Sequence, residues 1–214
     1  GWYDHYDDWG WSNNDWNNGW QGGSQNSDLV DMARLLTGEW YGPVTYSYLA
    51  DDGQSRQTDK FYADMKFFQY ANTRDALSGE GVETDYKYND DGSVADQQTL
   101  EFKWYIDDNY DIYIKYKNSG ATFVMDYGSS QAGFHLGYEK GHDKDTFWGY
   151  MIGTGSSKGD VIYIDLERVN QTSQAKAFGS SKTSEKTVKS SSSFGKGATI
   201  KPLKTDSSRL NNRR

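Results

Sequence analysis

Between residues 38 and 168, short runs alternate apolar and polar side chains, and this pattern constrains the fold more than any other feature. Successive side chains of a β-strand point to opposite faces, so a period of two predicts strands with one buried face. The clearest runs are Leu100, Phe102, Trp104 and Ile106; Ile112, Ile114 and Tyr116; and Ile162, Ile164 and Leu166. Asp, Asn and Gly residues separate the runs and favour tight hairpin turns. The region therefore predicts an antiparallel meander.

The alternation predicts nine strands, and their number decides how the sheet can close. We expect them near residues 38–49, 57–70, 78–88, 98–106, 109–117, 121–127, 133–140, 145–153 and 159–168. Such a meander forms an up-and-down barrel or a β-sandwich, and we predict the barrel. A closed, fully antiparallel barrel needs an even number of strands. The odd number therefore has four possible explanations: one strand is wrongly predicted, the barrel is open, one strand lies outside the barrel, or the fold is a β-sandwich.

The composition agrees with a strand-rich domain and excludes several kinds of chemistry. Aromatic residues make up 16% of the chain, with 17 Tyr and 9 Phe, and aromatic side chains favour the pleated surface of a sheet. The absence of cysteine excludes disulfides, thiolate metal ligands and thiol catalysis. The net charge is −8, and the acidic strand region argues against a nucleic-acid groove. No stretch is apolar for long enough to span a membrane as a helix.

The sequence divides into three parts of different character. Residues 1–27 are rich in Asp, Asn, Gly and Trp and have no helix or strand period. Residues 28–169 hold one short helix, expected at 28–36 with Asp28 as its N-cap, followed by the strands. Residues 170–214 are a basic tail rich in Ser and Lys. Because this tail has few apolar residues to bury, we expect it to be disordered or loosely docked.

The start of the strand region resembles the first strand of lipocalins and the wider calycin barrels. The segment reads Leu35-Leu36-Thr37-Gly38-Glu39-Trp40, a short helix that leads into Gly-x-Trp. In those families the tryptophan plugs the closed end of the barrel, and an arginine from the last strand packs over its ring. The resemblance implies a lipocalin-like barrel in which Gly38, Trp40 and Arg168 mark the closed end, with a cation–π contact between the last two.

The end of the strand region resembles the lipocalin-like domains of bacterial surface lipoproteins, most of which have no established function. The residues that carry this resemblance are Phe147-Trp148-Gly149-Tyr150-Met151 and Ile162-Tyr163-Ile164-Asp165-Leu166-Glu167-Arg168. It implies an extracytoplasmic protein, either secreted or anchored at the outer surface. The acidic start of the chain is similar to the export-signal region of such lipoproteins. We therefore expect membrane contact only through a lipid anchor that is missing from this sequence.

No motif for catalysis, metal binding or a cofactor occurs in the sequence. The three histidines lie in different regions, without an acidic residue placed as a third ligand. There is no nucleophile elbow, phosphate loop or dinucleotide-binding fingerprint. Glu80, Glu83 and Asp85 share one expected strand, but they do not form an evident glycosidase pair. We therefore expect a protein that is not an enzyme and that has neither a metal nor a cofactor.

The interior aromatic residues are the best candidates for a ligand site. If the first strand rises from Trp40, one set of side chains gathers at the open end: Tyr46, Tyr48, Phe61, Phe102, Tyr116, Tyr138 and Phe147. A mouth rich in tyrosine suits a small hydrophobic or aromatic ligand, because tyrosine offers both a ring face and a hydroxyl. Eight-stranded barrels are alternatively filled by their own side chains.

Two functions from different classes follow from this pattern. The first is a binding domain for a small apolar ligand. The second is a structural or interaction protein of the cell surface, with a solid barrel and adhesive tails. Five of the eight tryptophans, Trp2, Trp9, Trp11, Trp16 and Trp20, lie in the first 27 residues. That segment suggests stacking contacts with a glycan or a protein, or alternatively a linker to the anchor.

Overall fold

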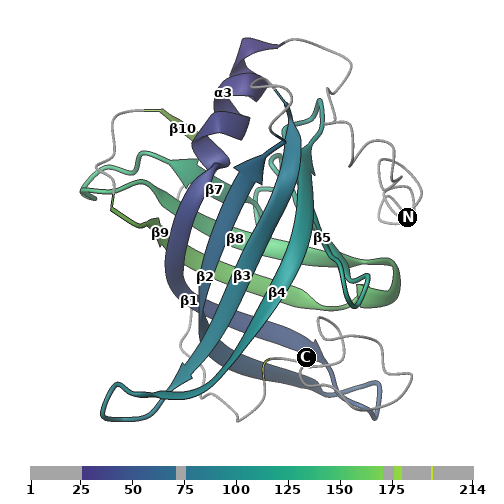
Figure 1. Cartoon of the computed structure of the whole chain (residues 1–214). Helices are drawn as coiled ribbons and strands as arrows, with labels where there is room; N and C mark the ends of the chain where they lie inside the picture. The colour runs from purple at the N-terminus through teal and green to yellow at the C-terminus, as the bar shows by residue number, and fades with distance from the viewer. Residues whose placement is uncertain (1–25, 71–75, 171–175, 180–193, 195–214) are drawn as a thin grey trace.

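The computed structural model describes residues 26–70, 76–170, 176–179 and 194 of the chain. Its main feature is a closed antiparallel barrel of eight strands, preceded by one short helix (Figure 1). The predicted fold class is thereby confirmed, and the β-sandwich alternative is excluded. In the part of the chain that the structure describes, no helix is long and apolar enough to cross a membrane.

The barrel is a meander in which most strands pair with their neighbours in sequence. The elements are α3 (Ser27–Leu36), β1 (Gly38–Leu49), β2 (Arg56–Gln69), β3 (Ser78–Tyr88), β4 (Val94–Ile106), β5 (Ile112–Tyr116), β6 (Thr122–Met125), β7 (Phe134–Gly137), β8 (Thr146–Thr154), β9 (Val161–Arg168) and β10 (Ala177–Gly179). Closure comes from β9, which pairs with β1 on one side and with β8 on the other. All nine predicted strands are present.

The odd strand number has a simple structural explanation. Strands β6 and β7 both pair with β8, and they use different parts of the same strand. β6 lies against Ile152–Thr154, whereas β7 lies against residues 146–149. The two short strands thus share one position around the barrel, and eight positions close the sheet.

Helix α3 covers the end of the barrel where β1 begins (Figure 1). Its buried side chains are Leu29, Met32, Ala33 and Leu36, at helical spacing on one face. The helix begins one residue earlier than predicted, and its N-cap is Asn26 instead of Asp28. The Asn26 side chain accepts hydrogen bonds from the backbone N–H groups of Asp28 and Leu29, at 2.7 and 3.4 Å. Asparagine caps as well as aspartate does, so sequence alone did not separate the two.

Part of the C-terminal tail docks on the barrel. Ala177–Gly179 form β10, which pairs antiparallel with β7 and gives that short strand a partner on its free edge. Phe178 and Phe194 are buried and belong to the hydrophobic core. Isolated aromatic residues in a polar tail do not raise its average hydrophobicity, so composition did not reveal them. The rest of the tail lies outside the described residues.

Candidate binding site at the barrel mouth

The end of the barrel under α3 is closed by Trp40 and Arg168. The guanidinium carbon of Arg168 lies 4.2 Å from the centre of the Trp40 ring. Both residues are buried, and they are cross-strand partners in the ladder between β1 and β9. The predicted contact between Trp40 and Arg168 is therefore formed.

Arg168 also ties α3 to the barrel. Its guanidinium donates hydrogen bonds to the backbone carbonyls of Leu35 and Thr37 and pairs with Asp145 at 3.2 Å. Leu35 lies in the last turn of α3, whose carbonyls have no partner within the helix, and Thr37 is the C-cap residue. Gly38 allows the close approach, because a Cβ at this position would lie 2.7 Å from an Arg168 nitrogen and its φ is +116°. The closed end is thus a single hydrogen-bonded unit.

The opposite end, which we call the mouth, is where the turns after β1, β3, β5 and β8 lie. The hairpins that join β1 to β2 and β3 to β4 extend away from α3 (Figure 1). Close to these turns, the inward-facing side chains change from apolar to polar. Towards the mouth, β2 ends its inward face with Asp59, and β3 ends its own with Lys87.

Phe194 from the C-terminal tail is buried at the mouth and is only 2% exposed. Its ring packs edge-to-face against Phe61, with 5.4 Å between ring centres. The ammonium of Lys87 lies 5.6 Å from the Phe194 ring centre, within reach of a cation–π attraction. The mouth therefore accommodates one aromatic ring, and the protein's own tail supplies it.

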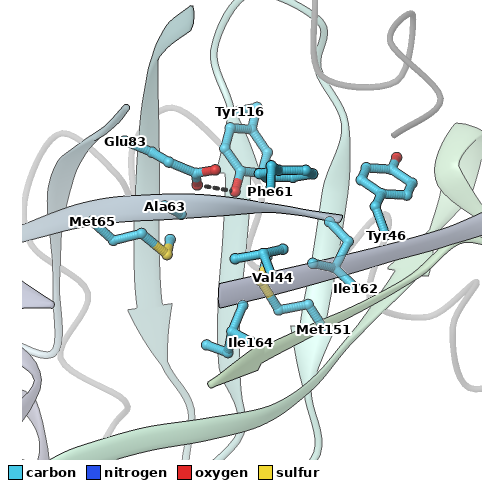
Figure 2. Close-up of a pocket in the computed structure, with 10 residues that line it drawn as sticks. All are labelled: Val44, Tyr46, Phe61, Ala63, Met65, Glu83, Tyr116, Met151, Ile162 and Ile164. Carbon is cyan, nitrogen blue, oxygen red and sulfur yellow. Dashed lines mark hydrogen bonds between the residues drawn. The ribbon is translucent and has the colours of Figure 1, made fainter. Parts of the chain in front are cut away.

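A small cavity lies deeper in the barrel (Figure 2). Its lining is Val44, Tyr46, Phe61, Ala63, Met65, Glu83, Tyr116, Met151, Ile162 and Ile164. Its free volume, measured as the space open to the centre of a water molecule, is about 10 Å³. That is room for about one water molecule. This cavity is therefore too small for an organic ligand.

Buried carboxylates surround this cavity and the mouth. Glu83 accepts a hydrogen bond of 2.5 Å from the Tyr116 hydroxyl (Figure 2), and Asp160 accepts one of 2.8 Å from Tyr46. Asp59 pairs with the Lys87 ammonium at 2.6 Å, and both side chains are at most 9% exposed. Burial is the main reason why the pKa of Tyr116 lies well above its usual value, and the charge of Glu83 adds to it.

Asp85 lies between these groups on β3 and has no exposed surface. One of its oxygens accepts a 2.8 Å hydrogen bond from the Gln98 amide on β4. Burial raises the pKa of Asp85 well above its usual value, and the neighbouring Glu83 raises it further through its charge and a hydrogen bond. Two carboxyls this close to each other must share a proton or take up a positive charge.

The structure brings together some of the predicted ligand residues and separates others. Tyr46, Phe61 and Tyr116 line the cavity. Phe102 lies next to Tyr116, with 5.9 Å between ring centres, and the half-buried Tyr48 packs on Tyr46 at 5.8 Å. These five residues occupy the mouth half of the barrel or its middle.

Phe147 and Tyr138 do not belong to the mouth, which corrects the sequence prediction. Phe147 packs on Trp40 at the closed end, with 5.4 Å between ring centres, because β8 starts beside the last residues of β9. Tyr138 follows the last residue of β7, so its side chain leaves the barrel wall and is 39% exposed. Parity alone fixes the face of a strand residue but not its height along the barrel.

The polar half of the site was not predicted from the sequence. Asp59, Glu83, Asp85, Lys87 and Gln98 are all buried. The signal was present, because Asp59 has the parity of Phe61, and Gln98 has the parity of Leu100 and Phe102. Phe194 had no such signal, since no strand period extends to it.

The outer face of the barrel carries an exposed group of tyrosines that was also not predicted from the sequence. Tyr41, Tyr62, Tyr86 and Tyr88 contact one another, with ring centres 5.4 to 5.8 Å apart. The hydroxyls of Tyr41 and Tyr88 lie 2.7 Å apart, and Tyr62 and Tyr88 are 41% and 38% exposed. The predicted contact region in residues 1–27 lies almost entirely outside the described residues, so this tyrosine group is a separate feature.

The fold and the mouth together define a closed antiparallel barrel with one plugged end and one polar, ring-accepting end. No protein family model matches the chain, and neither curated proteins nor solved structures gave a match. In the described part of the chain, no group of three or more His, Cys, Asp or Glu side chains is arranged to hold a metal ion. Function must therefore be argued from the geometry of the mouth.

Proposed function

We propose that this chain is a non-catalytic binding domain, a lipocalin-like barrel whose mouth takes a small ligand that carries an aromatic ring. In this proposal Phe194 fills the ring position when no ligand is bound. One observation carries it: an aromatic side chain that comes after all the barrel strands is buried at the mouth, against Phe61 and Lys87. A site that accepts a phenyl ring from the tail has the shape and chemistry to accept one from a ligand.

The way in which Phe194 is attached to the barrel supports its replacement by a ligand ring. Phe194 is joined to β10 by a polar segment and makes its contacts from outside the strand ladder, so its departure breaks no pairing within the barrel. Loss of one buried phenyl ring costs on the order of 3 kcal/mol. A ligand that binds with micromolar affinity or better gains more than this. The proposal also places the protein outside the cytoplasm, on the basis of its resemblance to bacterial surface lipoproteins.

The competing function is a solid barrel that acts through its surface. Two observations support it: the small size of the cavity, and the exposed tyrosine group around Tyr62 and Tyr88. The two functions differ in what happens when Phe194 is removed, because only a binding site gains affinity for rings from outside.

Substitution of Phe194 with alanine in the full chain tests the proposal. We expect Phe194→Ala to lower the melting temperature of the protein. In a thermal-shift screen of flavonoids, sterols, haem, fatty acids and oligosaccharides, the molecules with aromatic rings should raise the melting temperature of this variant again. A ligand at a hundredfold excess over its dissociation constant should restore about 2.7 kcal/mol. Phe68→Ala is the matched control, because Phe68 is 51% exposed on the outer face. If no ring-bearing molecule stabilises Phe194→Ala more than Phe68→Ala, the solid-barrel interpretation is the better one.

A further inference from the structure

We propose that the mouth site prefers an organic cation, namely an aromatic ring joined by a short linker to an ammonium group. The position of the ring rests on the proposed function, since the ligand ring takes the place of Phe194. The preference for an ammonium rests on separate observations about the buried oxygens beneath it.

Two of these oxygens lack a hydrogen-bond donor. They are one carboxylate oxygen of Asp85 and the amide oxygen of Gln98, and both are buried. The two residues are cross-strand partners on β3 and β4, and the Gln98 NH₂ group already donates to the other Asp85 oxygen. Turning the Gln98 amide over would only place its oxygen against the carboxylate. The Gln98 oxygen therefore has no donor, and the Asp85 oxygen has only the proton that Glu83 and Asp85 can share, so a ligand ammonium would supply hydrogen bonds that this group lacks.

The buried charges of this region also favour a ligand cation. Four carboxylates are buried in the mouth half of the barrel: Asp59, Glu83, Asp85 and Asp160. Among the described residues Lys87 is the one buried cation there, and its ammonium lies on Asp59. Arg168, the other buried cation, is at the opposite end with Asp145. A ligand carboxylate would face Glu83 and Asp85, whereas a ligand ammonium would be attracted by both.

The spacing along the strands fits a short linker. Phe194 contacts Phe61 on β2 and Lys87 on β3. Two residues further from the mouth, these strands carry Ala63 and Asp85, which are paired with each other. Two residues of strand span about 7 Å. A phenyl ring and an ammonium joined by two or three carbon atoms cover this separation. The cavity beside Glu83 has room for about one water molecule, which is also about the size of an ammonium group.

Calorimetric titration of the full chain carrying Phe194→Ala tests this preference at pH 7 with three probes that share one ring. We expect 2-phenylethylammonium to bind at least tenfold more tightly than 2-phenylethanol, and 3-phenylpropanoate to bind most weakly. Asp85→Asn and Glu83→Gln, each added to Phe194→Ala, should bring the ammonium and the alcohol to within about threefold of each other. Glu101→Gln is the control, because Glu101 lies on the outer face with its side chain 65% exposed, and it should leave the preference unchanged.

The outcomes separate this inference from the proposed function. Equal binding of the ammonium and the alcohol would overturn the ammonium preference but leave the ring site intact. Stabilisation by methylammonium or potassium as large as that by 2-phenylethylammonium would also overturn it, because the ring would then contribute nothing. Failure of all three probes to bind would contradict the proposed function itself.

Discussion

Replacing Trp40 with alanine should lower the free energy of unfolding by about 3–5 kcal/mol, the usual cost of removing a large buried aromatic side chain. Trp40 has no exposed surface, donates a 2.9 Å hydrogen bond to the Leu36 carbonyl and lies under Arg168. The substitution would leave a cavity between α3 and the barrel and remove the surface on which Arg168 rests. In a chain of this size the melting temperature should fall on the order of 10 °C.

Trp40→Phe provides the matched control, because it keeps an aromatic ring and loses the hydrogen bond to Leu36. Its cost should be smaller, about 1–2 kcal/mol from the hydrogen bond and the smaller ring. Denaturant unfolding monitored by circular dichroism would measure the free energy of unfolding of both variants. If Trp40→Ala costs no more than Trp40→Phe, the closed end does not depend on this packing.

Lys87→Met should also be strongly destabilising, by about 3–5 kcal/mol, because it leaves the buried Asp59 without its ammonium partner. Asp59 is fully buried, the two groups are 2.6 Å apart, and Lys87 also contacts the Phe194 ring. Adding Asp59→Asn to Lys87→Met should recover much of the loss, since the buried negative charge that Lys87 balances is then removed as well. A double-mutant cycle on the free energy of unfolding measures this coupling.

Lys66→Met serves as the control for loss of a lysine. Lys66 is on the outer face with its side chain 49% exposed, and it lies 3.9 Å from Glu39. Such an exposed pair contributes at most about 1 kcal/mol. If Lys87→Met costs as little as Lys66→Met, then the Lys87–Asp59 pair does not hold the mouth together.

The closed end could be predicted because the segment around Trp40 resembles lipocalins, and the positions of the residues along the chain agree with that resemblance. Gly38 and Trp40 follow directly on the helix, and Arg168 shares the parity of the apolar residues of the last strand. In the structure, the ladder between the first and last strands pairs Trp40 with Arg168. A one-residue error in either strand would have separated them, since it turns each side chain to the other face.

The mouth could be predicted only in part, because it depends on height along the barrel and on a residue far along the chain. Tyr46, Phe61 and Tyr116 were assigned by parity and do meet. The height of Phe147 follows from where β8 begins beside β9, which requires the strand pairing. Phe194 joins the site through contacts that no short-range pattern encodes.

The acidic pair in the interior was visible in sequence only as charged residues with inward parity. Glu83 and Asp85 alternate with outward-facing residues on β3, so their burial follows from the register of that strand. A charged residue on an inward face usually counts against a strand assignment, because burial of an unpaired charge is costly. Here the burial of the Glu83 and Asp85 carboxyls is the strongest indication of a site.

The most direct test of the ring site is a fluorine NMR spectrum of the full chain with 4-fluorophenylalanine at position 194. Without ligand, we expect the resonance of position 194 at a shift distinct from that of the urea-unfolded chain, because its ring is packed on Phe61 and Lys87. Addition of 2-phenylethylammonium, or of any ring-bearing ligand found in the thermal-shift screen, should move it to the unfolded value while the barrel stays folded. A resonance already at the unfolded value in the free protein, or one that stays in place when a ligand saturates the protein, would contradict the account.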